Sequence, residues 1–127
     1  MVTTILFPSL KLARIGVPLL VDTGADRTVL SSGDAQSLGP ALNGLSAGPL
    51  LGGVGGRIST RLVDAVLLLG SSLVPLVLTI PMPDQAGPSI PSILGRDMLS
   101  RYALVIEERT DRILLLEPQE ADLLNWP

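Results

Sequence analysis

The sequence predicts an all-β fold, as both its composition and the distribution of its proline and glycine residues indicate. Its 11 proline and 13 glycine residues are spread over 127 positions and divide the chain into short apolar runs. Such runs, bounded by turn-forming residues, are typical of strands rather than long helices. Hydrophobic residues make up 46% of the chain but aromatic residues only 2%, so we expect an aliphatic core. The length fits one domain over 1–127.

The apolar runs define the expected strands. In chain order these are Leu10–Ile15, Pro18–Val21, Thr28–Leu30, Leu50–Leu51, Ile58–Leu69, Leu73–Ile80, Ser92–Leu94, Ala103–Glu107 and Ile113–Leu116. Within Ile58–Leu69 polar residues give way to an aliphatic end, so we expect one end to be exposed and the other buried. The segment 109–112, Arg-Thr-Asp-Arg, separates the last two runs and predicts a hairpin turn.

Helices are expected to be few and short. Ser32 can cap a turn over Gly33–Leu38, which Gly39 and Pro40 would end. The segment Arg96–Tyr102 places its apolar residues at helical spacing and predicts one short helix in the C-terminal third. The tail 117–127 predicts an extra terminal helix over Pro118–Trp126.

The composition excludes several kinds of chemistry. There is no cysteine and no histidine, which removes disulfides, thiol catalysis, a Ser-His-Asp triad and thiolate- or histidine-bound zinc. Carboxylates are then essentially the only groups suited to acid–base work near neutral pH. We expect no cofactor. With a net charge of −3 and no basic stretch, nucleic acid is not an expected partner.

The chain is expected to be soluble and cytoplasmic. No run approaches the ~18 apolar residues of a membrane span, and Met1–Leu10 lacks the features of a secretory signal. The sequence is equally compatible with a domain of a longer protein. Charged residues reach only 17%, which a dimer hiding apolar surface would explain.

The most informative motif is Asp22-Thr23-Gly24-Ala25-Asp26, directly behind the apolar run 18–21. This arrangement presents a carboxylate at the end of a strand, on a turn that Gly24 allows to bend tightly. The tripeptide by itself also fits an ordinary surface turn. A calcium loop does not fit, because Gly33 occupies the position that needs a bidentate glutamate, so no metal is expected.

Two further segments accompany this motif. Residues 51–56, Leu-Gly-Gly-Val-Gly-Gly, predict a flexible hairpin tip that can approach a ligand backbone closely. A phosphate-binding loop does not fit, because no Lys-Ser/Thr follows and the glycine spacing misses the dinucleotide fingerprint. The segment 92–99, Ser-Ile-Leu-Gly-Arg-Asp-Met-Leu, predicts a strand passing tightly into a helix. A buried Arg96 would need a carboxylate partner, and Asp26 is the candidate.

In this order and spacing, the three segments resemble the retropepsins, the dimeric aspartic proteases of retroviruses and their cellular and bacterial relatives. The resemblance covers about residues 10–116 and leaves out the run 70–88 and the tail. It implies a closed β-barrel that forms half of an acid protease. It also implies a homodimer that cleaves peptides without a cofactor or metal.

The resemblance also implies roles for individual residues. Asp22 would be the catalytic carboxylate, with Thr23 interlocking the two active-site loops and Gly24 completing the motif. The residues expected to bind substrate are Ala25, Asp26, Arg27, Gly53, Val54, Gly55, Pro91 and Ile93. Asp26 and Arg96 would form a structural ion pair.

Two positions depart from related enzymes. Arg27 stands where retroviral enzymes often have an acidic residue, which leaves the charge preference of the pocket open. Ala25 replaces the serine of many two-lobed aspartic proteases, whose hydroxyl donates to the ionised carboxylate. We therefore expect a less acidic working pH than theirs, and a strongly acidic activity maximum would contradict this.

Two functions follow from this sequence. The first is an aspartic endopeptidase that holds substrate as an added strand under a glycine-rich flap. The alternative is a non-catalytic dimerisation or peptide-binding module of the same fold. A small-ligand barrel has no support beyond the many short strands.

Overall fold

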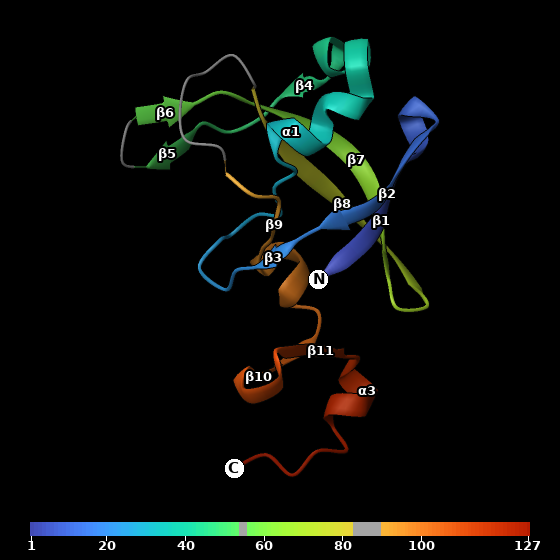
Figure 1. Cartoon of the computed structure of the whole chain (residues 1–127), viewed down its shortest axis with the longest axis vertical. Coiled ribbons are helices and arrows are strands. Elements are labelled where there is room, and N and C mark those ends of the chain that lie inside the picture. Colours follow the sequence, from blue (N-terminus) through green and yellow to red (C-terminus); the bar gives the residue numbers. More distant parts are fainter. Residues whose placement is uncertain (54–55, 83–89) are drawn as a thin grey trace.

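The computed structural model describes residues 1–53, 56–82 and 90–127 (Figure 1). Its strands are β1 (Val2–Phe7), β2 (Leu12–Pro18), β3 (Leu20–Val21), β4 (Ser46–Ala47), β5 (Leu51–Gly53), β6 (Gly56–Ile58), β7 (Thr60–Leu69), β8 (Ser72–Pro81), β9 (Ile93–Leu94), β10 (Ala103–Glu107) and β11 (Arg112–Leu116). The α-helices are α1 (Ser32–Ala35), α2 (Arg96–Leu99) and α3 (Pro118–Ala121). Turns of 3-10 helix occupy Pro8–Leu10, Gln36–Gly44 and Glu108–Thr110.

The main sheet is built around β7. Strand β8 pairs with β7 along its whole length, while β1 and β4 pair with its other edge and β2 follows β1. The all-β prediction is therefore confirmed. The expectation of a closed barrel was wrong, because β2 and β8 each pair with only one strand of this sheet. Pro75 lies within β8 and has no N–H to offer a further strand, which helps to keep that edge open.

The core lies against one face of this sheet and is aliphatic, as predicted, apart from Met98 and Phe7. Strand β1 was not among the predicted strands, yet Ile5 and Phe7 from it are fully buried. The hydroxyl of Thr3 donates to the carbonyl of Leu68 at 2.5 Å, so even a polar residue of β1 is tied to β7. Along β1 every second residue is buried, the pattern of a strand with one face against the core.

The predicted strand Thr28–Leu30 is instead an irregular segment that links two sheets. Val29 bridges in parallel to Thr79 of β8 and antiparallel to Ile93 of β9. Strand β9 in turn pairs in parallel with β3, Leu20 opposite Ile93. The segment thus joins the β3–β9 pair to the main sheet, and no single strand runs beside it for long enough to make it regular.

The helices are shorter than predicted. The cap of α1 is Ser31 rather than Ser32, since its hydroxyl accepts from the N–H of Asp34 at 3.1 Å. Gly39 breaks the following turns with a φ of 55°, as its place before Pro40 predicted. The terminal helix ends at Ala121, whose carbonyl accepts from the indole of Trp126. No helix in the described ranges is long and apolar enough to cross a membrane.

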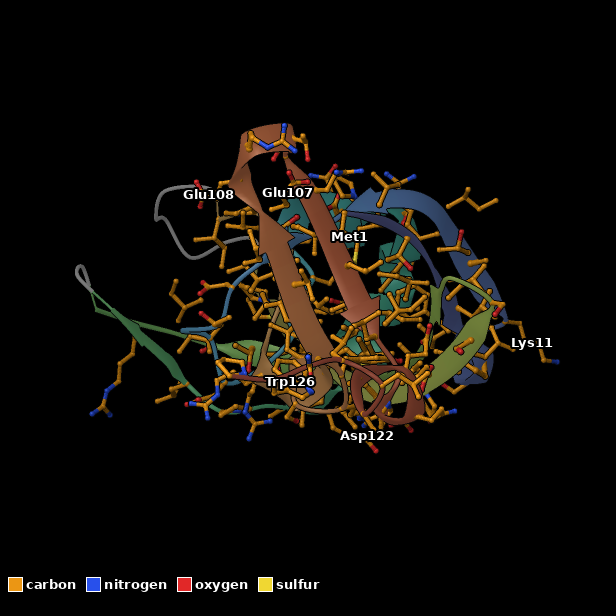
Figure 2. The ribbon with its side chains drawn as sticks, turned by 90° about the horizontal axis from the view of Figure 1, so that it is seen from below. Met1, Lys11, Glu107, Glu108, Asp122 and Trp126 are labelled. Carbon is orange, nitrogen blue, oxygen red and sulfur yellow. The ribbon has the colours of Figure 1, made fainter. Side chains whose placement is uncertain are left out.

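The chain ends in a hairpin that projects from the rest of the molecule. Strands β10 and β11 pair only with each other among the described strands, with Ala103 opposite Leu116 and Glu107 opposite Arg112. Figure 1 places this hairpin and α3 at the lower end, away from β4, β5 and β6. In Figure 2 the hairpin crosses the face seen from below, with Glu107 and Glu108 at its tip.

Candidate active site

The loop carrying Asp22 begins where the parallel β3–β9 pair ends. Val21 lies opposite Leu94 in that pair, and the N–H of Asp22 donates to the carbonyl of Leu94 at 3.1 Å. The backbone of Asp22 is therefore anchored to β9, a strand that is distant in sequence. The residue itself is half-buried. This confirms the sequence-based expectation of a carboxylate at the end of a strand.

The carboxylate of Asp22 is oriented by its own turn. The N–H of Gly24 donates to Oδ1 of Asp22 at 2.8 Å, and the N–H of Ala25 donates to the Asp22 carbonyl at 3.2 Å. A Cβ on Gly24 would lie 3.2 Å from Oδ1, tighter than ordinary van der Waals contact. Glycine therefore lets the backbone N–H approach the carboxylate.

The loop returns under the start of α2, where Gly95 is essential for packing. A Cβ at Gly95 would lie 2.4 Å from the carbonyl oxygen of Arg27 and 3.0 Å from that of Ala25. The N–H of Arg96 donates to Ala25 O at 2.8 Å, and that of Asp97 to Asp26 O at 3.2 Å. The predicted tight passage into a helix is thus a contact between the 92–99 segment and the Asp22 loop.

A hydrogen-bonded pair that the sequence analysis missed, buried Thr28 and half-buried Asp97, holds this contact together. The hydroxyl of Thr28 donates to Oδ1 of Asp97 at 2.6 Å, and its N–H donates to Oδ2 at 3.0 Å. The same hydroxyl accepts from the N–H of Gly95 at 3.1 Å. Thr28 is fully buried, so loss of Asp97 would leave two donors without partners, at a cost of about 1–3 kcal/mol for each.

The expected ion pair between Asp26 and Arg96 is not formed in the described chain. Both side chains are exposed, and the ion pairs among the described residues lie at the β10–β11 turn. Arg96 starts α2 with its side chain in solvent, and it is the next residue, Asp97, that turns toward the loop. The sequence signal was an acidic residue in the first turn of a helix, which is a favoured position for negative charge.

A second unpredicted network lies behind the β3–β9 pair. The hydroxyl of Ser92 donates to Oδ2 of Asp34 at 2.6 Å and accepts from the N–H of Ser31 at 2.9 Å. Ser92 is almost fully buried, and its carbonyl accepts from the N–H of Leu20. This network joins α1 to the strand pair that presents Asp22.

The remaining predicted substrate residues fall into two places. Ile93 is half-buried in β9 and exchanges backbone hydrogen bonds with Val29, while Pro91 just before it is exposed. Gly53 ends β5 opposite Gly56 of β6, so the predicted glycine-rich hairpin is formed up to that pair. Val54 and Gly55 lie outside the described residues. In Figure 1 this hairpin and the Asp22 loop project toward the same side of the molecule.

Other site residues are open to solvent. Thr23, Asp26 and Arg27 are exposed, whereas Ala25 is half-buried. In the part of the chain that the structure describes, no group of three or more Asp or Glu residues could hold a metal ion. The loop therefore presents one oriented carboxylate, accessible to a ligand.

Comparisons with known proteins point to one family. A family model described as aspartyl protease matches residues 13–98. DNA damage-inducible protein 1 of Yarrowia lipolytica is 31% identical over 113 residues, which cover 87% of this chain and 28% of that protein. The chain thus spans little more than a quarter of this relative's length.

Solved structures give a second comparison. The chain is 25% identical to EIAV protease complexed with the inhibitor HBY-793, with a TM-score of 0.55 over 79% of this chain and 85% of that one. A retropepsin-like aspartic protease from Rickettsia conorii is 21% identical, with a TM-score of 0.63 over 88% of this chain and 78% of the other. The second likeness concerns the fold alone.

Proposed function

Because the chain belongs to the aspartyl protease family and is retropepsin-like, we propose that two copies of it form one endopeptidase site, with an Asp22 from each. The observation that carries the proposal is the Asp22 carboxylate, held at a strand end by Leu94 O and Gly24 N–H. The sequence contains this loop once, and the chemistry needs two carboxylates. We propose that the second comes from another copy of this domain.

In the proposed reaction the two Asp22 carboxyls share one proton, as is established for aspartic-protease dyads. The ionised carboxylate takes a proton from water, whose oxygen attacks the peptide carbonyl carbon. The other carboxyl donates its proton to the carbonyl oxygen, giving a neutral tetrahedral diol. The carboxyl that took the water proton then gives it to the amide nitrogen while the other carboxylate takes a proton from one hydroxyl of the diol, so that the C–N bond breaks and an acid and an amine are released.

The C-terminal hairpin supports pairing with a second copy. Ile106 and Leu114 are each 53% exposed, and their neighbours Val105 and Ile113 are also exposed. Val105 lies opposite Leu114 and Ile106 opposite Ile113, so both faces of the hairpin expose apolar side chains, a feature that marks protein–protein contacts. We propose that this surface, β10 and β11, is the dimer contact.

The other predicted residues take supporting roles in this proposal. Thr23 would hydrogen-bond to its counterpart across the dimer axis. Ala25, Asp26 and Arg27 would contact substrate backbone and side chains. The hairpin residues Gly53, Val54 and Gly55 would cover the bound peptide, and Pro91 and Ile93 would line side-chain pockets.

The test combines substitution with mixing. Wild-type protein and the Asp22→Asn variant are assayed with a peptide library, alone and mixed at a fixed total concentration. We expect Asp22→Asn to abolish cleavage and, when in excess, to suppress the wild-type activity by capturing wild-type chains in mixed dimers.

Asp64→Asn is the matched control, since Asp64 is an exposed residue of β7 that lies outside the site. It should be active and should not suppress the wild type. Specific activity should also fall on dilution below the dimer dissociation constant. Equal cleavage by Asp22→Asn and wild type would refute the protease proposal and favour a peptide-binding module.

A further inference from the structure

A hollow next to the Asp22 loop is not used by the reaction. It has a volume of about 420 Å³ and is lined by residues of three elements that are far apart in sequence. They are Asp26, Arg27, Leu76, Val77, Asp97 and Arg101. The active-site loop, the outer edge of β8 and the end of α2 therefore meet here. The hollow has room for a whole side chain.

At the β8 edge of this hollow, the peptide groups of Val77 have no hydrogen-bond partner among the described residues on the side away from β7. Thr79 directs its N–H to Thr28 O and accepts from the N–H of Leu30, so its peptide groups face away from β7. Alternate residues of a strand direct their peptide groups to the same edge. Val77 and Pro75 therefore face outward too, and Arg101 donates to Pro75 O at 3.1 Å in agreement with this. An extended peptide can pair with Val77 at this edge.

The charged groups of the hollow are not equivalent. Both oxygens of Asp97 already accept hydrogen bonds from Thr28, so this carboxylate is turned inward and satisfied. Neither Arg27 nor Arg101 forms an ion pair within the described residues, and both are exposed. The two guanidinium groups therefore have donors left for a ligand, in a geometry suited to carboxylates.

We propose that this hollow is a substrate subsite that selects an acidic side chain, aspartate or glutamate, through Arg27 and Arg101. The inference rests on the proposed function, because it takes the peptide to run past Asp22 and Asp26 toward the β8 edge. Arg27 is the position at which the sequence left the charge preference open, and Arg101 supplies the second cation. In a two-fold symmetric dimer the subsite occurs at both ends of the cleft, so acidic residues on either side of the cleaved bond are favoured.

The test uses peptides that differ only in Glu, Gln or Lys at one position, scanned along the sequence on both sides of the cleaved bond. At one position on each side, we expect kcat/KM to be about threefold to tenfold higher for Glu than for Gln, and the ratio to shrink as salt is raised. Arg101→Gln and Arg27→Gln should each lower the Glu/Gln ratio, and Arg101→Glu should shift the preference toward Lys. The readout is the ratio, which a general loss of folding or activity does not move.

Lys11→Gln is the matched control, because it removes one positive charge from an exposed turn whose residues do not line this hollow. It should keep the wild-type ratio. If wild type cleaves all peptides with a ratio of one, or if Lys11→Gln lowers the ratio as much as Arg101→Gln, the subsite is refuted while the protease proposal stands.

Binding to the Asp22→Asn variant, measured by fluorescence anisotropy with the same peptides, separates the two ideas further. Tighter binding of the Glu peptides that Arg101→Gln abolishes supports the subsite even without turnover. Absence of cleavage by wild type, together with that binding preference, would refute the proposed chemistry and retain the subsite in a binding module. Equal binding of all three peptides overturns the subsite.

Discussion

Two hairpins of this molecule have the same turn geometry but differ in how they pack against other strands. In β1–β2 and in β10–β11 a short 3-10 turn is followed by a residue in the left-handed conformation, Lys11 (φ 53°, ψ 40°) and Asp111 (φ 54°, ψ 48°). The residues before the turns, Phe7 and Glu107, also have similar backbone angles. Yet β1 is enclosed between β2 and β7, whereas β10 and β11 have only each other among the described strands.

The difference shows that turn geometry and burial are decided separately. The turn depends on the local dihedral preferences of a few residues, so it recurs wherever those preferences are met. Burial depends on the neighbouring elements: Phe7 is fully enclosed by them, whereas Ile106 and Leu114 each remain 53% exposed. The second hairpin therefore carries the apolar surface that we assign to the partner copy.

The largest expected effect comes from the matched positions before the two turns. Phe7→Ala removes a fully buried aromatic ring and should lower the free energy of unfolding by about 3–5 kcal/mol, because a cavity remains in the core. Glu107→Ala, at the equivalent position of the exposed hairpin, should lower the free energy of unfolding far less, because solvent screens the interactions of this side chain. Urea unfolding of both variants measures this. Similar costs at the two positions would contradict the contrast in burial.

The second prediction concerns the exposed hairpin alone. Leu114→Asp places a charge on the proposed dimer contact and should weaken self-association by roughly 10- to 100-fold, about 1.4–2.8 kcal/mol, while monomer unfolding changes little. Analytical ultracentrifugation gives the association constant, and activity at fixed concentration should fall in parallel. Ile15→Asp, at an apolar residue of β2 that is 77% exposed, is the control and should leave association intact.

A smaller effect distinguishes the two left-handed residues. Aspartate tolerates this conformation better than lysine, because its short side chain can hydrogen-bond locally. Lys11→Gly should therefore be more favourable than Asp111→Gly by a few tenths of a kcal/mol up to about 1 kcal/mol. Thermal unfolding of the two variants compares them. Equal shifts would show that the turns are under equal strain.

The smallest effect is a pH dependence confined to the exposed turn. Hydrogen bonds from Thr110 first, then from Arg112 and, less strongly, Arg109 hold the pKa of Glu107 below its usual value, although desolvation opposes them. A lowered folded-state pKa stabilises the turn above the unfolded pKa, and this contribution is lost as the pH falls through the folded value. The effect is small because the group is solvent-screened.

An NMR titration of the Glu107 carboxyl checks this prediction. The Arg112→Gln variant should move the Glu107 midpoint upward, toward the ordinary glutamate value. The turn at Pro8–Leu10 contains no acidic residue and should show no transition in the same range. An unchanged midpoint in Arg112→Gln would contradict the assignment.

Much of the fold was readable from the sequence because it depends on short-range preferences. Strands β7, β8 and β10 lie within two residues of their predicted bounds, and the break at Gly39 and the turn at 109–112 follow from residue type. Strand β1 was missed although its burial alternates. Two threonines at its start interrupt the apolar pattern that predicts a strand. In the folded chain, pairing with β7 lets the hydroxyl of Thr3 donate to Leu68 O.

The candidate site likewise has features that the sequence predicted and features that depend on long-range contacts. Residue types alone placed Asp22 after a strand and Gly24 in a tight turn. Which acidic residue clamps the loop could not be read from them, since Asp26 and Asp97 are both adjacent to an arginine in sequence. The structure selects Asp97 because its side chain meets Thr28, sixty-nine positions away.

The sequence by itself thus determined the all-β class, the presentation of Asp22 and the exclusion of histidine and cysteine chemistry, because these follow from composition and local backbone preferences. Tertiary structure alone decided that the sheet stays open, that Asp97 rather than Arg96 secures the loop, and that Arg27 and Arg101 face one hollow. Each of these depends on contacts between residues far apart in the chain, whose geometry is set only when the whole core packs.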